Sequence, residues 1–221
     1  MRNYFFVLLL CFFFVEGFSQ SSHSSIQTKL QNGTPPKQLL REGVSIDLLY
    51  GKIYEGGYIF YFFPEDSSGL VVGQHNLSYK HDTTKKIIWS CRNANTGATE
   101  TKIGSGLRNS IKIKNVECPL YDADKKVWMP SAAELCLDYS YDGFDDWYLP
   151  SKDELHEVYM KLGYTKLVDF KNKGYWSSSE KDNEFAWIEH IKYGPREFEL
   201  FGQSYYRKFY ADFVRPIRTF K

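Results

Sequence analysis

The stretch DWYLPSKDEL, residues 146–155, places three acids, a serine, a lysine and a tryptophan within a short segment. A serine beside a base could be a nucleophile, and clustered polar side chains could bind a ligand. A structural interpretation competes with both. Ser151 and Glu154 have the spacing of a helix capping box, and Pro150 restricts the residue before it. We therefore expect this stretch to turn a short strand into a helix, not to form an active site.

Other motifs for catalysis or metal binding are weak. Ser177–Ser179 lack the Gly-x-Ser-x-Gly setting of a hydrolase, the histidines are scattered, and the cysteines have no Cys-x-x-Cys spacing. Calcium needs roughly six to eight oxygen ligands, whereas acids in turns often bond their own backbone. We predict no cofactor, with calcium as the alternative. The acids that could bind it are Asp122, Asp124, Asp142, Asp145 and Asp146.

The N-terminus has the pattern of a secretory signal peptide over residues 1–19. Arg2 precedes an apolar run from Tyr4 to Val15, which is too short to span a bilayer, and cleavage is expected after Ser19. We therefore predict a secreted or cell-surface protein with no transmembrane segment after cleavage. Residues 20–49 are expected to form a flexible leader with short helical turns, and residues 50–221 the folded domain.

Export makes a disulfide plausible, because the compartment outside the membrane is oxidising. Three cysteines follow the signal: Cys91, Cys118 and Cys136. Cys118 and Cys136 close the shorter loop and are the predicted pair, which leaves Cys91 as the odd thiol. The alternative is that all three are buried, unpaired side chains.

Composition narrows the class of protein. The chain has 221 residues, with 28 Lys and Arg against 27 Asp and Glu, so nothing predicts a nucleic-acid partner. It holds 17 Phe, 17 Tyr and 5 Trp, which favours a compact domain with an aromatic-rich core and long ordered loops.

The expected elements are those of an α+β domain. A hairpin is predicted over 56–73, a strand over 85–91, and helices over 107–118, 129–139 and from Ser151 to a left-handed cap at Gly163. Leu107 and Ile111 are expected to face inward. GYWSSSE (174–180) is expected to turn through its serines, and strands are predicted over 185–193, 198–202 and 213–220.

Several motifs in order resemble the Lcl C-terminal domain family, which is named for the tail of a collagen-like bacterial adhesin. They are YGKIYEGGYIFYF (50–62), IGSGLRNS (103–110), AAELCLDYSYDGFDDWYLPSKDEL (132–155), YWSSSE (175–180) and VRPIRTF (214–220). The resemblance implies a fold like the C-type lectin and formylglycine-generating-enzyme folds. Those folds pair the first and last strands and place two helices beside a small twisted sheet. Extra residues within 115–135, and many Phe, Tyr and Arg residues after 180, depart from the family pattern.

For function, the resemblance implies an extracellular binding module, because the named member is associated with adhesion and sulfated polysaccharides. We expect a non-enzymatic module for a polysaccharide or a surface protein. The alternatives are an enzyme of the formylglycine-generating-like fold and a structural part of a cell-surface assembly; the oligomeric state is left open. The candidate ligand-binding residues are Tyr121, Trp128, Tyr193, Arg196 and Arg207.

Charged residues in the shared motifs predict structural ion pairs. Isolated charges are rarely buried without partners, so Arg215 and Arg218 of the last strand are expected to reach Asp146 and Glu180. The structural motif residues are Asp146, Trp147, Pro150, Ser151, Glu154, Trp176, Glu180, Arg215 and Arg218.

Overall fold

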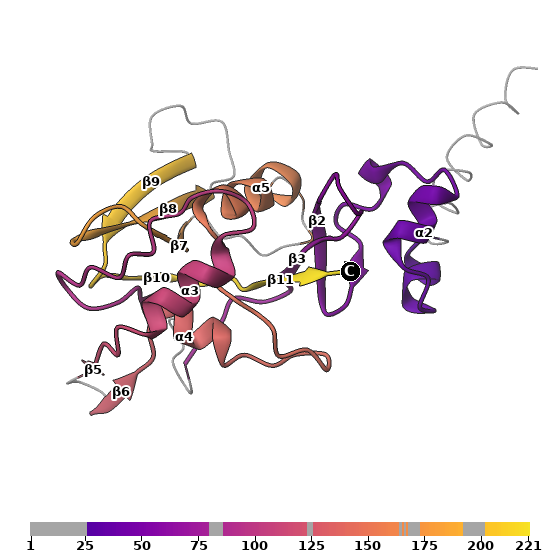
Figure 1. Cartoon of the computed structure of the whole chain (residues 1–221). Helices are drawn as coiled ribbons and strands as arrows, with labels where there is room; N and C mark the ends of the chain where they lie inside the picture. The colour runs from indigo at the N-terminus through magenta and orange to yellow at the C-terminus, as the bar shows by residue number, and fades with distance from the viewer. Residues whose placement is uncertain are drawn as a thin grey trace, which may run out of the picture.

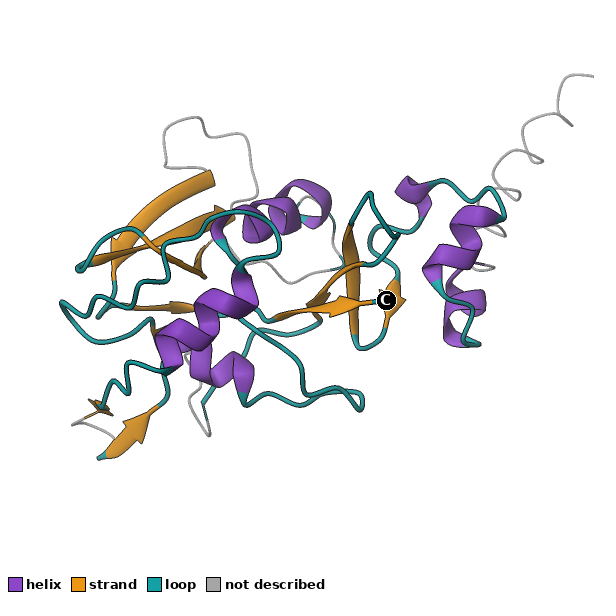
Figure 2. Ribbon diagram, viewed as in Figure 1, coloured by secondary structure: helices purple, strands orange, loops and turns teal. Residues whose placement is uncertain are grey.

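A computed structural model describes residues 26–79, 86–122, 126–163, 165, 167, 173–191 and 202–221. The predicted signal peptide lies outside these residues. The described chain is a mixed α+β structure with two main β-sheets and a separate two-stranded sheet (Figure 1 and Figure 2). Within the described residues, no helix is both long and apolar enough to cross a membrane.

The first sheet is antiparallel, with strand order β1-β2-β3-β11. Its strands are β1 (Ile53–Tyr54), β2 (Gly57–Phe62), β3 (Gly69–Gly73) and β11 (Ile217–Phe220). The predicted hairpin is therefore present as β2 and β3, and the last strand of the chain pairs with it. β3 is buried along its whole length because it lies between two strands and under the N-terminal segment.

The short helical turns expected before β1 are present, and they pack against the first sheet. Residues 26–31 are helical, followed by α2 (Pro36–Arg41) and the 3-10 helix η1 (Ile46–Leu48). Leu39 and Leu49 are fully buried and belong to one core cluster with Ile59 and Phe220 of the sheet. The apolar side chains of this segment cover one face of the first sheet. The helices lie beside that sheet in Figure 1.

The second sheet has strand order β4-β10-β7-β8-β9. Its strands are β4 (Lys86–Ile88), β10 (Ala211–Phe213), β7 (Lys173–Glu180), β8 (Phe185–Ile191) and β9 (Gly202–Arg207). Only the pairing of β10 with β7 is parallel among these described strands. GYWSSSE is therefore a strand, not a turn. Its three serines are buried; Ser177 donates to the Trp187 carbonyl and Ser179 to the Glu100 carbonyl, whereas Ser178 Oγ has no hydrogen-bond partner among the described residues.

The expected single strand over 213–220 is divided between the two sheets. β10 ends at Phe213 in the second sheet, and β11 begins at Ile217 in the first. Pro216, which has no amide hydrogen to donate, lies in the crossing between them. The two sheets thus share one continuous chain segment.

Three helices pack on the second sheet: α3 (Gly106–Lys114), α4 (Ala132–Leu137) and α5 (Lys152–Leu162). Neighbouring residues of β7 show which face each helix covers. Tyr175 belongs to the core cluster with α5, and Trp176 to the cluster with α3 and α4. Because successive strand residues point to opposite faces, α5 covers one face and α3 and α4 the other.

Both predicted capping boxes are present, at Ser131 and at Ser151. Two other local predictions are wrong. Leu107 and Ile111 are exposed, because the buried side of α3 is formed by Asn109, Ser110 and Ile113. Gly163 has right-handed backbone angles, not a left-handed cap.

The two-stranded sheet is a hairpin of β5 (Leu120–Asp122) and β6 (Val127–Met129). A disulfide joins Cys91 to Cys118, just before β5, so the predicted Cys118–Cys136 pairing is wrong. Cys136 is instead a buried free thiol on α4. Sequence distance failed as a guide because the fold brings a loop next to Cys118 while α4 turns Cys136 into the core.

Candidate functional site

The DWYLPSKDEL stretch has structural roles. Glu154 is fully buried, and its Oε2 accepts from the Ser151 amide at 2.6 Å, which closes the capping box. Its Oε1 accepts from the Gly104 amide at 2.8 Å. Burial raises the pKa of Glu154, against the opposing effect of these hydrogen bonds. The carboxyl joins the start of α5 to the preceding loop, and Ser151 donates to Lys102 in the same loop.

The predicted arginine pairs are correct in part. Arg218 is 5% exposed, and its guanidinium donates to Asp146 Oδ1 at 2.6 Å, to Asp146 Oδ2 at 3.1 Å and to Glu55 Oε2 at 2.6 Å. Arg215 is also buried, where it donates to Asn76 Oδ1 and the Gly73 carbonyl. Arg218 on β11 and Arg215 in the crossing before it thus tie the end of the chain to the domain body.

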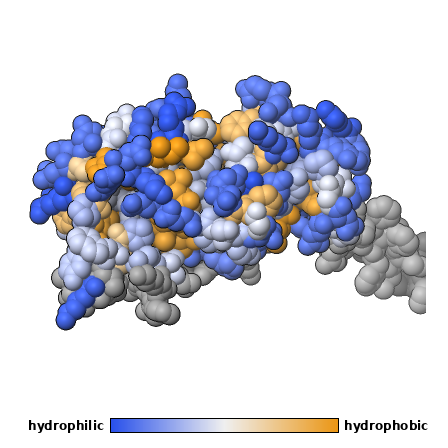
Figure 3. Space-filling model, turned by 60° about the horizontal axis from the view of Figure 1, so that its bottom comes forward, coloured by the Kyte–Doolittle hydropathy of each residue, from blue (hydrophilic) through white to orange (hydrophobic). Residues whose placement is uncertain are grey.

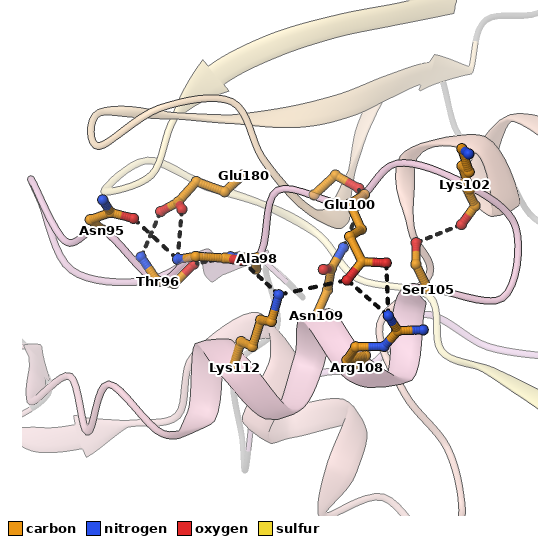
Figure 4. A network of polar contacts seen from close by, with 12 residues as sticks. Asn95, Thr96, Ala98, Glu100, Lys102, Ser105, Arg108, Asn109, Lys112 and Glu180 are labelled. Carbon is orange, nitrogen blue, oxygen red and sulfur yellow. Dashed lines mark hydrogen bonds and ion pairs between the residues drawn. The ribbon is translucent and has the colours of Figure 1, made fainter.

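Glu180 pairs with a lysine and not with an arginine. Its carboxylate accepts from the amides of Thr96 and Gly97 (Figure 4). It also accepts from Lys208 Nζ, and the Lys208 side chain is itself fully buried. Lys208 also donates to the Ala94 carbonyl at 2.6 Å. Thr96, Gly97 and Ala94 all belong to the loop that follows Cys91, so the Glu180–Lys208 pair holds this loop in place.

The same loop is held to α3 by a second group of contacts. Glu100 accepts from Arg108 at 3.0 Å and lies 3.7 Å from Lys112 Nζ, while Lys112 donates to the Gly97 carbonyl (Figure 4). Asn109 donates to the Glu100 carbonyl at 2.6 Å. These contacts order a loop that has no regular secondary structure.

The three cysteines that the structure describes are either oxidised or buried. Cys91 and Cys118 are oxidised in the disulfide, and burial raises the pKa of the Cys136 thiol well above its ordinary value. Thiolates are the reactive form of cysteine, so a buried neutral thiol is inert.

For calcium, Asp146 is already bound to Arg218, and the part of the chain that the structure describes contains no group of three potential metal ligands.

An aromatic platform covers the outer part of the β8–β9 pair. Alternate residues of β8 face the same side as α5, and their register partners on β9 continue that face. Phe185 and Trp187 meet Tyr205 edge-on, with ring centroids 5.4 Å and 5.9 Å from the tyrosine ring. Tyr205 is 46% exposed. The term aromatic platform denotes these three rings.

Three cations lie on the platform. Lys181 Nζ is 3.4 Å from the Tyr205 ring centroid, and Lys152 Nζ is 4.2 Å from that of Trp187. The Arg207 guanidinium is 5.5 Å from the Phe185 ring centroid and 3.5 Å from Glu184. Each cation is attracted by the face of an aromatic ring, which orders long side chains that are otherwise free to rotate.

A buried acid lies at the α5 end of the platform. The side chain of Glu189 is 1% exposed, and its Oε2 is 3.2 Å from His156 Nδ1. Within the described part of the chain, its Oε1 has no hydrogen-bond partner. Burial raises the pKa of Glu189 to about 7, although His156 and Lys152 act in the opposite direction.

The predicted ligand residues are divided between two places. Tyr121 and Trp128 face each other across the β5–β6 hairpin, with ring centroids 5.0 Å apart, and are 53% and 62% exposed. Arg207 belongs to the platform on another sheet, whereas Tyr193 and Arg196 lie outside the described residues. The face shown in Figure 3 has hydrophobic patches between hydrophilic residues, as the mixed charge of the sequence suggests.

Sequence reasoning missed Trp187, Tyr205, Lys181 and Lys152 as site residues. The signal for Trp187 was the alternation of FAWIEHI, which places Phe185, Trp187 and Glu189 on one face of a strand. The lysines could not be found in this way, because they come from a turn and a helix that only the fold brings to the rings.

Comparisons with known proteins yield no family. No protein-family model matches the chain, and no curated protein matches it.

Proposed function

We propose that the chain is an exported, non-enzymatic binding module whose aromatic platform holds a polysaccharide. The observation that carries the proposal is the exposed Tyr205 ring, set beside Trp187 and bordered by three cations. An aromatic ring offers a flat apolar surface to the C–H face of a sugar, and neighbouring cations favour acidic substituents. The proposal therefore favours an anionic polysaccharide.

Export and family membership belong to the same proposal. A disulfide supports an oxidising compartment, which agrees with the signal pattern of residues 1–19. Pairing of the last strand with the first hairpin supports membership of the Lcl C-terminal domain family and its C-type-lectin-like fold. Adhesion at the cell surface would follow from binding a polysaccharide there.

The test is a glycan array that includes sulfated polysaccharides, probed with residues 20–221 at two salt concentrations. We expect binding that weakens as salt rises, because surface charges are screened. Tyr205→Ala should weaken binding by roughly tenfold, the loss typical of a central contact residue. Tyr206→Ala is the matched control, since Tyr206 is 42% exposed but points to the opposite face of β9. Equal losses in both variants would contradict the platform.

A second candidate is a protein contact through the β5–β6 hairpin, as in a structural part of a surface assembly. Its support is the exposed Tyr121–Trp128 pair on a hairpin next to a disulfide. If Trp128→Ala abolishes glycan binding while Tyr205→Ala leaves it unchanged, the hairpin is the contact surface instead.

A further inference from the structure

We infer that Glu189 makes binding of an anionic polysaccharide to the aromatic platform dependent on pH, with tight binding when its carboxyl is protonated and weaker binding when it is ionised. This inference rests on the proposed function and adds regulation to it. It concerns a buried acid whose one oxygen contacts His156 of α5 while the other has no hydrogen-bond partner among the described residues.

The surroundings of Glu189 favour the neutral acid. Its side chain is almost fully buried, and Oε2 has His156 as a hydrogen-bond partner. Among the residues that the structure describes, Oε1 has no hydrogen-bond partner. A buried carboxylate is usually stabilised by several hydrogen bonds or a close cation. The contact with His156 can persist in both states, because the acid can donate to the ring when protonated and accept from it when ionised.

Among the described residues, the groups that face this carboxyl come from three elements. α5 provides His156 and Lys152, both of which favour ionisation. On β7 the register neighbour is Tyr175, a buried phenol, and on β9 it is Gln203, which is uncharged. Lys152 is thus shared by Glu189 and the platform, since its ammonium group also lies over the Trp187 ring.

Ionisation of Glu189 therefore changes the charge that the platform presents. Below about neutral pH the carboxyl is uncharged, and Lys152, Lys181 and Arg207 act on a ligand without opposition from this residue. Above neutral pH, the Glu189 carboxylate adds a negative charge near Lys152. Because the Glu189 side chain is buried and interacts electrostatically with Lys152, this charge is screened less than a surface charge would be, and it opposes an anionic ligand. The buried acid needs no contact with the ligand to act in this way.

The experiment measures binding of the wild-type protein to dextran sulfate by titration calorimetry at about pH 6 and about pH 8. Neutral dextran is the control polymer. We expect affinity to fall several-fold at the higher pH, and Glu189→Gln to bind at both values as tightly as the wild type does at the lower one. Glu157→Gln is the matched control, because it removes the same charge from α5 near Tyr50 and Tyr61, away from the platform. That variant should keep the pH dependence.

A second readout needs no change in affinity. Linkage requires that an anionic ligand favours the protonated acid, so the wild type should take up protons on binding near pH 7, and Glu189→Gln should not. Buffers of different ionisation enthalpy reveal this uptake. Wild-type binding without pH dependence, or pH dependence retained in Glu189→Gln, overturns the inference alone. No wild-type binding at either pH overturns the proposed function and the inference together.

Discussion

Arg218 binds acids that are far apart in the sequence, Glu55 before β2 and Asp146 before α5. Its guanidinium also lies 3.8 Å from the Phe144 ring centroid. The Arg218–Asp146 pair could be predicted because both residues stand in recognisable motifs. The partner of Glu180 could not, because Lys208 lies beyond β9 in a turn with no local signal.

Replacing Arg218 should destabilise the fold. Arg218→Ala leaves two carboxylates without their cation and should lower the free energy of unfolding by about 2 kcal/mol. Arg218→Lys should recover only part of this, since lysine cannot bind a carboxylate with two parallel hydrogen bonds. Denaturant titration measures both. Arg108→Ala, which breaks an exposed pair with Glu100, should change the value by less than about 1 kcal/mol. Equal effects at the two arginines would contradict this account.

Glu189 should make stability depend on pH. Its pKa rises from the ordinary 4.5 to about 7 on folding, so the folded state retains a proton that the unfolded chain releases. The stabilising contribution of Glu189 to the free energy of unfolding is fully present below pH 4.5. It decreases as the pH rises and is lost above about pH 7. The loss is on the order of 3 kcal/mol. Thermal unfolding should be measured across this pH range. The unfolding temperature of Glu189→Gln, relative to that of the wild type, should increase as the pH rises. A constant difference would show that Glu189 ionises normally.

At the scale of elements, the two capping boxes start helices in different surroundings. The box of α5 is buried, and Glu154 also accepts from Gly104, whereas Glu134 of α4 is partly exposed and bonds the Ser131 amide. Both boxes have the same sequence pattern, a serine followed three residues later by a glutamate. Their burial differs because only one of them lies under a loop.

Removing the two carboxyl groups should therefore have unequal effects. Glu154→Ala leaves buried amides without acceptors and should cost about 2–3 kcal/mol of unfolding free energy. Glu134→Ala should cost about 0.5–1 kcal/mol, the usual value for a cap. Denaturant titration of both variants gives the comparison. If Glu154→Ala loses less unfolding free energy than Glu134→Ala, burial of the Glu154 carboxyl does not contribute to stability as proposed.

Local patterns predicted the β2–β3 hairpin and the beginnings of α4 and α5, since these depend on neighbouring residues. β7 was missed because serines are frequent in turns, and only a covered sheet explains why Ser177–Ser179 are buried. For the candidate site, Arg207 was selected but Tyr205 was not. Alternation shows that β9 has two faces, yet it does not show which face the lysines of other elements approach.

At the scale of the molecule, the disulfide links the loop after β4 to the base of the β5–β6 hairpin. The cysteines are 27 positions apart, so replacing Cys91 and Cys118 together with serine should destabilise the fold by about 3 kcal/mol. Peptide mapping under non-reducing conditions should recover a Cys91–Cys118 bridge. A Cys118–Cys136 bridge in that map would contradict the structure.

The N-terminal segment should be required by the rest of the domain. A fragment of residues 50–221 lacks Leu39 and Leu49 and exposes Ile59 and Phe220, so it should unfold at a lower temperature and bind a hydrophobic dye. A fragment of residues 26–221 is the control and should be as stable as residues 20–221. If the shorter fragment is equally stable, burial by the N-terminal helices contributes little.

The crossing from β10 to β11 has a consequence for when the two sheets can form during synthesis of the chain. Each of the two main sheets takes one strand from residues 211–220, so neither sheet is complete before this segment has been synthesised. A polypeptide that emerges from its N-terminus cannot close either sheet early. Such delayed closure keeps the chain in a form that can be threaded through a translocation channel, which is what the proposed export of this protein requires.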